Sequence, residues 1–333
     1  VLIKSGEAME SIAAASHVVL DKTGTLTHGE AVVCSFEVQG CKVGDPAWRE
    51  ALKLVASVEL LSTHPLAEAI CRFATGQGVT LLKAEDPEHV YGCGIMGVVD
   101  GRRLAIGTAA FLEGHDLVTP ARVRSGGEVP LLEVHFAAPA SSQHSALAGH
   151  VLLEDPLREG AGAAVEKLRQ LGLRVSILSG DRSAHLESVA KKVGVHDARG
   201  GCLPQEKARL VKELSSSGQV IMVGDESNDA PALAAAHVGI SVGRSGLASQ
   251  SADVVVAEHP SAGALERIAR LVALSRTVVA TAGRGVRCGL GLSALQVAAA
   301  GSGRIPPKAN AIMQELVDLS ALVNAASVLS HRW

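Results

Sequence analysis

The stretch that decides the fold is VVLDKTGTLT at residues 18–27. Its three apolar residues are typical of a short buried strand, and an aspartate, a lysine and a glycine turn follow them directly. Two later stretches repeat this order: the apolar pair 177–178 precedes SGD at 179–181, and the apolar run 221–223 precedes GDESND at 224–229. Ligands of open α/β sheets collect at the carboxyl ends of the parallel strands, so these three strand ends are predicted to converge on one site.

Apolar and amphipathic segments alternate along residues 150–257. We predict helices at 160–171, 183–193, 205–216 and 230–236. We predict strands at 150–153, 174–178, 220–223, 237–242 and 253–256, in addition to 18–20. Strands that alternate with helices favour right-handed βαβ units and therefore a doubly wound parallel sheet.

The stretch 34–149 has a different character. It carries Gly-rich and Pro-rich turns, helices predicted at 45–62 and 66–74, and then alternating segments such as 95–99 and 131–136. We therefore predict an α+β domain at 34–149 that is inserted into a doubly wound α/β domain formed by 1–33 and 150–260.

The composition excludes several classes of protein. With 47% hydrophobic residues, the 333-residue chain is not intrinsically disordered. A net charge near −3 gives no electrostatic case for a nucleic-acid partner. The six cysteines are dilute and never spaced as CxxC, which disfavours a disulfide scaffold and structural zinc. Because the chain opens at Val1 without an initiator Met or a signal-like segment, we expect it to be the later part of a longer protein.

The hydrophobic surplus is concentrated toward the C-terminal end. No charged residue occurs between 288 and 303, and only two interrupt the apolar run 309–330. With the Pro306-Pro307 break between them, these runs predict a membrane-spanning helical hairpin within 261–333. The first run is shorter than the roughly 20 residues that a bilayer core requires, so a buried soluble hairpin stays open as the alternative.

The residue types at the three strand ends suit phosphoryl transfer. A carboxylate at Asp21 can attack a phosphorus atom in line and form an acyl phosphate. Asp225 and Asp229, together with Asp21, can hold Mg²⁺, which prefers hard oxygen ligands. Lys207, at the head of a predicted helix, supplies a cation for the transferring group, and Ser179 supplies a hydroxyl donor.

One position separates this chain from related phosphatases. In phosphatases with the same strand-end arrangement, the residue two after the nucleophile is a second aspartate that acts as acid and base. Here that residue is Thr23. Without the second acid an acyl phosphate is expected to persist, which suits a device that stores energy.

Together these residues resemble a known family. DKTGTLT at 21–27 is similar to the phosphorylation motif of the P-type ATPases, and the whole chain resembles the C-terminal portion of their heavy-metal-transporting (type IB) branch. The further motifs that carry the resemblance are STHPLA at 62–67, GCGIMG at 92–97, DPLR at 155–158, SGD at 179–181, LPQEK at 203–207 and NDAPAL at 228–233. The resemblance implies an α/β fold: a doubly wound, haloacid-dehalogenase-like parallel sheet with an inserted α+β nucleotide-binding domain and a C-terminal transmembrane helical hairpin.

The resemblance also implies roles for the residues at the strand ends. Asp21 is the implied aspartyl-phosphate nucleophile, and Thr23 is implied to contact Mg²⁺ and phosphate. Asp225 is implied to hold Mg²⁺ with the support of Asp229. The implied ligands of the phosphoryl group are Ser179, Gly180, Lys207 and Asn228.

Four residues of the inserted domain are implied to form the adenine end of an ATP site: Glu59, His64, Gly92 and Gly94. The chemistry of these residue types gives modest support of its own to an adenine site. Glycines let the backbone approach a ligand closely, and an imidazole can form a hydrogen bond with a purine edge. Alternatively, His64 only caps the helix that begins near Pro65.

The activity that the resemblance implies is ATP-driven transport of a heavy-metal cation through an aspartyl-phosphate intermediate, with ATP and Mg²⁺ as cofactors. It implies a multi-pass protein of the cell membrane with cytoplasmic catalytic domains. The N-terminal membrane helices and the actuator domain of the family have no counterpart in these 333 residues, so they are implied as partners. The chain alone is expected to bind ATP and to phosphorylate itself, but not to pump.

One residue departs from the family pattern. The usual Gly-Asp-Gly-x-Asn-Asp is GDESND at 224–229, so Glu226 replaces a glycine beside the implied magnesium ligand Asp225. This departure keeps a non-catalytic ATPase fragment open as an alternative. A membrane-tethered phosphatase of the same superfamily is a second alternative, which Thr23 and the insert at 34–149 disfavour.

Two carboxylates in the last predicted helix bear on the transported ion. Glu315 and Asp318 are three residues apart and so share a helix face. Carboxylates inside a membrane are unfavourable unless they are partnered or functional. An aspartate in this last helix resembles the zinc, cadmium and cobalt pumps of the branch more than the copper pumps, and oxygen ligands favour divalent ions over Cu⁺. The resemblance therefore implies a divalent substrate of the zinc, cadmium or cobalt type. The alternative is that the two carboxylates pair with Arg284 or Arg287 as a structural contact.

Overall fold

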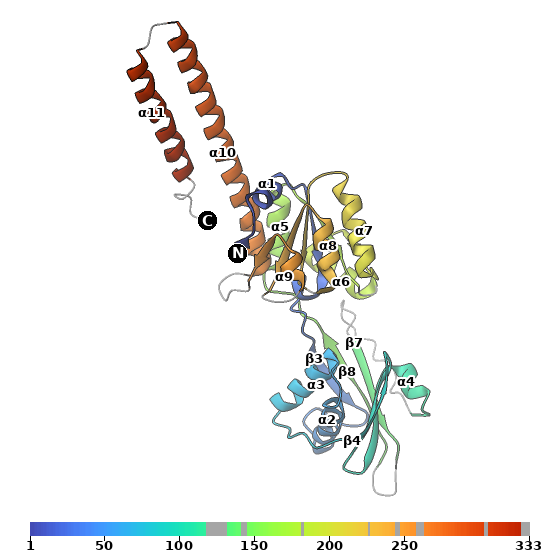
Figure 1. Ribbon diagram of the computed structural model, residues 1–333. Coiled ribbons are helices and arrows are strands. Elements are labelled where there is room, and N and C mark those ends of the chain that lie inside the picture. Colours follow the sequence, from blue (N-terminus) through green and yellow to red (C-terminus); the bar gives the residue numbers. More distant parts are fainter. Residues whose placement is uncertain are drawn as a thin grey trace. The chain divides into compact units, whose positions relative to one another are not determined.

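The computed structural model describes residues 1–117, 132–140, 145–180, 183–225, 227–243, 247–257, 263–302 and 306–327. The chain divides into two compact units (Figure 1). The parallel-sheet unit comprises Val1–Thr25, Glu159–Asp181 and Ala190–Trp333. The antiparallel-sheet unit comprises Leu26–Arg158 and, from a later helix, the residues up to Val189.

A seven-stranded sheet forms the centre of the parallel-sheet unit, in the order β1-β13-β12-β11-β2-β9-β10. The strands are β1 (Leu2–Ile3), β2 (His17–Asp21), β9 (Arg174–Leu178), β10 (Asp197–Arg199), β11 (Val220–Gly224), β12 (Val238–Val242) and β13 (Val254–Val256). Only the edge strand β1 runs antiparallel to its neighbour. Every residue of β2, β11 and β12 is buried, as expected for central strands covered on both faces. The predicted doubly wound parallel sheet is confirmed.

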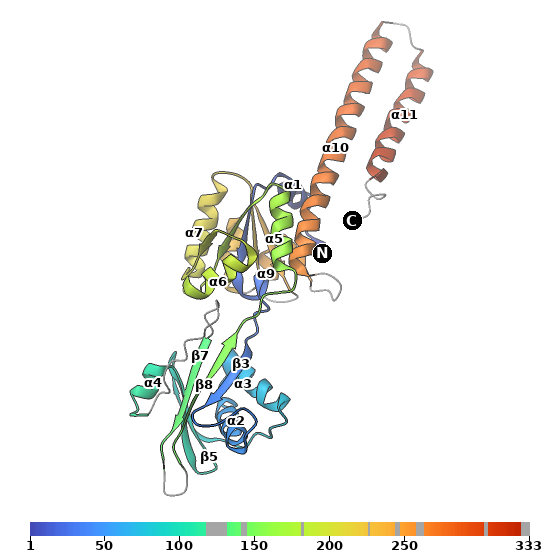
Figure 2. The same ribbon diagram turned by 180° about the vertical axis from the view of Figure 1, so that it is seen from behind.

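Helices pack on both faces of this sheet. The helices of this unit are α1 (Gly6–Ala14), α5 (Ala161–Gln170), α7 (Pro204–Ser215), α8 (Ala230–Ala235) and α9 (Leu247–Ser251), with a 3₁₀ turn, η2, at Ser227–Asp229. Helix α6 (Ser183–Val193) is divided between the units, and only its residues from Ala190 onward belong to this one. One face carries α1 and α5 together with the first turns of α10 (Ala264–Gly301), as Figure 2 shows. The other face carries α7, α8 and α9. The predicted helices at 160–171, 205–216 and 230–236 correspond to α5, α7 and α8.

Strand register positions the site. β2 lies between β9 and β11, with Asp21 paired with Leu178 and Leu20 paired with Val223. The residues that follow β9 and β11 therefore emerge on either side of Asp21, at the carboxyl edge of the sheet.

The antiparallel-sheet unit contains six strands in the order β3-β8-β7-β6-β5-β4. Their bounds are β3 (Val32–Val38), β4 (Glu85–Val90), β5 (Gly94–Val99), β6 (Arg102–Gly107), β7 (Leu132–Ala138) and β8 (Leu147–Glu154). Helices α2 (Pro46–Glu59) and α3 (Pro65–Gly76) pack together against this sheet, and the short α4 (Ala109–Glu113) packs against β6 and β7. The predicted inserted α+β domain is therefore confirmed.

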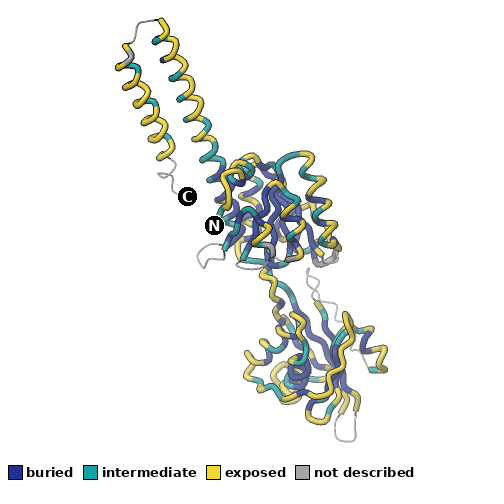
Figure 3. Tube along the Cα trace, viewed as in Figure 1, coloured by how far each residue is buried: buried dark blue, intermediate teal, exposed yellow. Residues whose placement is uncertain are grey.

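An aromatic cluster fills the core between this sheet and its helices. The ring of Phe36 stacks on that of Phe136, with 5.0 Å between centroids, and meets Trp48 edge-on at 5.6 Å. The indole Nε1 of Trp48 donates a hydrogen bond to the carbonyl oxygen of Phe36 at 2.8 Å, so this buried polar group is satisfied. Strand β4 is exposed along its length, whereas much of α2 and of the other strands is buried (Figure 3).

The strand predicted at 150–153 was assigned to the wrong sheet. It is part of β8, which pairs with β3 and β7 in the antiparallel sheet, Val151 lying opposite Phe36 and Val134. The two points at which the chain passes from one unit to the other therefore differ from the predicted divisions at 33 and 149. The chain changes unit after Thr25 and again after Arg158.

The predicted C-terminal hairpin is present as α10 and α11 (Pro307–Ala326), which pack against each other. Arg276 of α10 fixes the beginning of the hairpin to the parallel-sheet unit. Its guanidinium donates hydrogen bonds to the carbonyl oxygens of Ala13 at 3.3 Å, Ala15 at 3.1 Å, and Leu171.

The later turns of α10 and all of α11 are largely exposed (Figure 3). Within the described ranges, no helix has the combined length and apolar character needed to span a bilayer. The prediction that the hairpin crosses a membrane is therefore not confirmed by its hydropathy.

A polar clamp holds the two connecting segments together inside the antiparallel-sheet unit. The carboxylate of Asp155 accepts hydrogen bonds from the hydroxyl of Thr27 at 2.6 Å and from the backbone N–H of Gly29 at 2.9 Å. A bridge between Thr27 and Leu157 lies beside it, and the N–H of Arg158 donates to the carbonyl oxygen of Leu26 at 2.9 Å. Thr27 is buried, so loss of its acceptor removes a partner that water cannot readily replace.

We expect Asp155→Ala to lower the free energy of unfolding by about 1–3 kcal/mol, because two donors lose their acceptor. Urea unfolding followed by circular dichroism measures the change. The matched control is Glu113→Ala, which removes an exposed carboxylate of the same unit. Equal unfolding midpoints for the two variants would show that the clamp contributes nothing to stability.

Candidate active site and pocket

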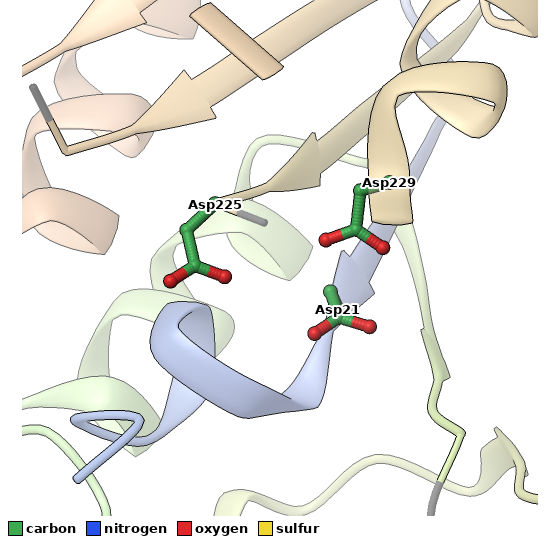
Figure 4. A group of neighbouring side chains, drawn as sticks. All are labelled: Asp21, Asp225 and Asp229. Carbon is green, nitrogen blue, oxygen red and sulfur yellow. The ribbon is translucent and has the colours of Figure 1, made fainter. Parts of the chain in front are cut away.

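Three aspartates meet at the carboxyl edge of the parallel sheet (Figure 4). Asp21 ends β2, Asp225 follows β11, and Asp229 lies in η2. One carboxylate oxygen from each lies within 4.8 Å of the other two. Asp21 is 3% exposed and Asp229 is 1% exposed, so two of the three carboxylates are withdrawn from water. The structure thus brings together the residues predicted to hold Mg²⁺.

Lys207 reaches this cluster from the first turn of α7. Pro204 occupies the first helical position, where its missing N–H is not needed, and the N–H of Lys207 bonds to the carbonyl oxygen of Leu203. The buried ammonium Nζ lies 2.5 Å from Oδ1 of Asp21 and 2.9 Å from Oδ1 of Asp229. The predicted cation therefore contacts the predicted nucleophile directly.

Burial and charge set the protonation of these groups. The pKa of Asp21 is raised to about 7: burial is the largest cause, the neighbouring Asp229 carboxylate adds to the rise, and Lys207 opposes it. For Lys207 burial alone would lower the pKa, but the Asp21 and Asp229 carboxylates outweigh it and raise the pKa above its ordinary value. Lys207 is therefore charged, and the cluster around it retains excess negative charge.

The donor set fits a magnesium ion. Oδ2 of Asp229 is buried without a hydrogen-bond partner among the described residues, which leaves a hard oxygen available for a cation. Gly24 has a φ of +69°, and a Cβ there would lie 1.6 Å from Oδ2 of Asp225. Only a glycine lets the loop after Asp21 approach the Asp225 carboxylate this closely. Asp21, Asp225 and Asp229 would be the ligands, with the half-buried Thr23 in the same loop.

The remaining residues predicted for the phosphoryl group lie at the same edge of the sheet. Ser179 is buried immediately after β9, and the exposed Gly180 follows it. Asn228 is exposed in η2, beside Asp229. Asp181 and Glu226 lie outside the described residues, so the effect of Glu226 in place of the usual glycine is not tested by the structure.

A separate cavity of about 720 Å³ lies in the antiparallel-sheet unit. All four residues predicted for the adenine end of a nucleotide site line it: Glu59, His64, Gly92 and Gly94. They come from the last turn of α2, the N-cap of α3, the turn after β4 and the start of β5. Residues up to 35 positions apart in the chain thus converge on one hollow.

His64 caps a helix and also lines the cavity, so its predicted contact with adenine stays a prediction. Its Nδ1 accepts a hydrogen bond from the N–H of Leu66 at 3.2 Å, so it caps α3. It also lines the cavity. In the neutral ring an accepting Nδ1 leaves the proton on Nε2, which is then a hydrogen-bond donor.

Two further residues of the cavity were not predicted. Gly107 ends β6, and a Cβ on it would lie 2.3 Å from the carbonyl oxygen of Cys93, so only glycine fits. Thr108 donates its N–H to the same oxygen at 2.9 Å, and its hydroxyl accepts from Phe111 N as the cap of α4. A glycine followed by a capping threonine at a strand end is a visible signal, but its closeness to Cys93 depends on the pairing of β5 with β6.

Comparison with known proteins defines the class. The family model for haloacid dehalogenase-like hydrolases matches residues 15–237, and the chain belongs to this family. The match runs from β2 to just before β12, and so includes all three aspartates and Lys207.

Relatives found by sequence comparison are metal-transporting ATPases. The chain is 36% identical over 282 residues to the probable copper-transporting ATPase PacS of Synechococcus elongatus, an alignment of 84% of this chain and 36% of that protein. It is 31% identical over 335 residues to a copper-exporting P-type ATPase of Staphylococcus saprophyticus, with 98% of this chain and 39% of that one aligned. The chain thus spans less than half the length of these curated relatives.

Solved structures agree with the sequence relatives. A zinc-transporting PIB-type ATPase in its E2·Pi state matches 98% of this chain and 52% of its own, with a TM-score of 0.81 and 29% identity. The catalytic domain of the CPx-ATPase CopB-B matches 83% of this chain and 95% of its own, with a TM-score of 0.60 and 26% identity. The resemblance to the C-terminal portion of heavy-metal P-type ATPases is confirmed.

Glu59, a buried residue of the cavity, makes the folding stability depend on pH. It is 6% exposed, and burial raises its pKa to about 7. Because the pKa of Glu59 is higher in the folded state than in the unfolded chain, the folded state holds this proton more tightly. The stability that comes with the bound proton is complete at low pH and is lost as the pH rises through the folded pKa.

We therefore expect Glu59→Gln to be more stable than the parent chain by about 1–3 kcal/mol near pH 8, with the difference vanishing near pH 4. Chemical unfolding at both pH values, without nucleotide, measures it. Glu113→Gln, an exposed carboxyl, is the control and is expected to show no such difference. The same stability gap at both pH values would contradict a buried titrating carboxyl.

Proposed function

We propose that the parallel-sheet unit transfers the γ-phosphoryl group of ATP to Asp21. The observation that carries this proposal is the buried Asp21 carboxylate, held by Lys207 next to Asp225 and Asp229. An oxygen of Asp21 forms a bond to the γ-phosphorus while the bond from that phosphorus to the β–γ bridging oxygen breaks, and ADP leaves with the electron pair. Lys207 offsets the charge of the entering phosphate oxygens.

Asp21, Asp225 and Asp229 would hold Mg²⁺, which supplies charge neutralisation for the phosphate oxygens when bound. Thr23 stands where related phosphatases carry a second acid, so the acyl phosphate is not hydrolysed at once. This favours a stored aspartyl phosphate over simple phosphatase activity.

The cavity of the antiparallel-sheet unit is proposed to bind the nucleotide. Glu59 supplies a carboxyl oxygen, His64 an Nε2–H donor, and Gly92 and Gly94 a backbone without side chains. These groups suit the polar edge and flat face of an adenine ring.

Transport is proposed as the activity of a longer protein that contains this chain. The relatives are named as copper-transporting or copper-exporting ATPases and are more than twice as long as this chain. Much of the hairpin surface is apolar and exposed, including Leu290, Leu295, Val297, Leu316 and Leu322. We propose that this surface contacts lipid and preceding membrane helices in a multi-pass cell-membrane protein, that the two units are cytoplasmic, and that an actuator domain completes the cycle.

The transported ion is proposed to be divalent, of the zinc, cadmium or cobalt type. Asp318 accepts a hydrogen bond from Gln314 at 3.2 Å, and Arg284 donates to Thr281. In the described part of the chain, no ion pair joins Glu315 or Asp318 to an arginine, so both carboxylates remain available as oxygen ligands. Copper is the second candidate, because the sequence relatives are named as copper transporters.

Incubation of the chain with γ-labelled ATP and Mg²⁺ tests the phosphoryl transfer. We expect a label that is stable in acid, is released by hydroxylamine and disappears in Asp21→Asn, because only an acyl phosphate behaves in this way. Asp253→Asn, which removes a carboxylate elsewhere in the same unit, is expected to keep the label.

The other outcomes identify the alternatives. Rapid release of phosphate without a stable label would favour a phosphatase. Neither label nor release would favour a non-catalytic fragment.

Equilibrium dialysis of the chain in detergent micelles tests the ion. We expect Zn²⁺, Cd²⁺ or Co²⁺ to bind more weakly to Asp318→Asn, by about tenfold or more, because an anionic oxygen ligand is lost. Glu10→Gln, an exposed carboxylate on α1, is the control. Loss of Cu⁺ binding alone in the Asp318 variant would favour a copper transporter instead.

A further inference from the structure

A short turn between β4 and β5 forms one rim of the cavity. Its backbone is fixed at both sides: the N–H of Cys93 donates to the carbonyl oxygen of Val90 at 3.0 Å, and the carbonyl oxygen of Cys93 accepts from Thr108 at 2.9 Å. Gly92 has a φ of +71°, which a residue with a side chain adopts only with strain. The turn therefore holds the residue before Gly92 at a defined place on the rim.

That residue is Tyr91, the single tyrosine of the chain. It lines the cavity, yet its exposure is 103%, as high as in an extended peptide. The other rings of this unit are used differently. Those of Phe36, Trp48, Phe111 and Phe136 are buried, and that of Phe73 is partly buried against the core. The ring of Tyr91 thus lies in water at the mouth of the cavity and does not contribute to the packing of the core.

The inner lining of the cavity offers apolar surface as well as the polar groups already described. Leu66, Ile95, Ile106 and Val134 are among the residues that line it. A flat ring that entered between this lining and Tyr91 would remove apolar surface from water on both of its faces. A tyrosine has only two side-chain torsions, so ordering it costs less entropy than ordering a long aliphatic side chain.

We propose that Tyr91 stacks on the base of the bound nucleotide and closes the open side of the cavity over it. This inference rests on the proposed nucleotide function of the cavity and adds a residue that selects for a planar base. The contact is made by the ring, while the hydroxyl stays in water. Phenylalanine is therefore expected to replace tyrosine, whereas alanine is not.

The experiment measures binding of the non-hydrolysable β,γ-methylene analogue of ATP to the whole chain by calorimetry. We expect Tyr91→Ala to raise the Kd by about 5- to 100-fold, because a base–aromatic stack is lost. Tyr91→Phe is expected to stay within about twofold of the parent chain. Val43→Ala is the matched control: it truncates a residue of the same unit that is 76% exposed and does not line the cavity.

Binding of inorganic triphosphate distinguishes the loss of a stacking contact from a general loss of affinity. Inorganic triphosphate has no base, so its Kd is expected to be unchanged in Tyr91→Ala. An equal loss for both ligands would overturn the stacking proposal, as would a Kd for the ATP analogue that does not change. If the parent chain binds no ATP analogue at all, the proposed nucleotide function fails as well, and this result is distinct from the first two. Thermal unfolding of Tyr91→Ala is expected to match the parent chain, because the exposed ring supports no packing.

Discussion

The parallel-sheet unit is organised around one unfavourable arrangement, the burial of acidic groups at the edge of its sheet. A carboxylate withdrawn from water is destabilising unless it is paired, and Lys207 pairs with both Asp21 and Asp229. The pairing is incomplete, since the pKa of Asp21 remains raised by burial and by Asp229. The cluster keeps an attraction for further positive charge, and this suits it to bind a cation together with the phosphate oxygens that the cation accompanies.

The chemistry of this edge could be predicted because each signal is local. An apolar run followed by a polar turn marks a strand end, and parallel pairing brings such ends together whatever the order of the strands. The sheet to which 150–153 belongs could not be predicted in this way. An apolar run indicates a strand but not its partner, and β8 is fixed by its pairing with Phe36 and Val134, far away in sequence. Gly107 and Thr108 were missed for the same reason, because their contact with Cys93 exists only after β5 and β6 have paired.

The scarcity of aromatic residues also has a structural meaning. The chain holds seven, and six of them lie between residues 34 and 149. The core of the parallel-sheet unit is therefore built from aliphatic side chains such as those of Val19, Met222 and Leu233, which fit between a sheet and closely packed helices. The rings are concentrated in the antiparallel-sheet unit, where three of them form the stack at Phe36 and one stays in water at the cavity.

The acidic cluster and the C-terminal hairpin are both attached to the central strands of the parallel sheet. Asp21 ends β2, and every residue of that strand is buried. Arg276 of α10 bonds to Ala15, just before β2 begins, and to Leu171, shortly before β9. Because close-packed interiors have low compressibility, β2 holds Asp21 at a fixed distance from the residues that α10 binds. The acidic cluster at one end of β2 and the helix α10 fixed near its other end thus belong to one packed layer.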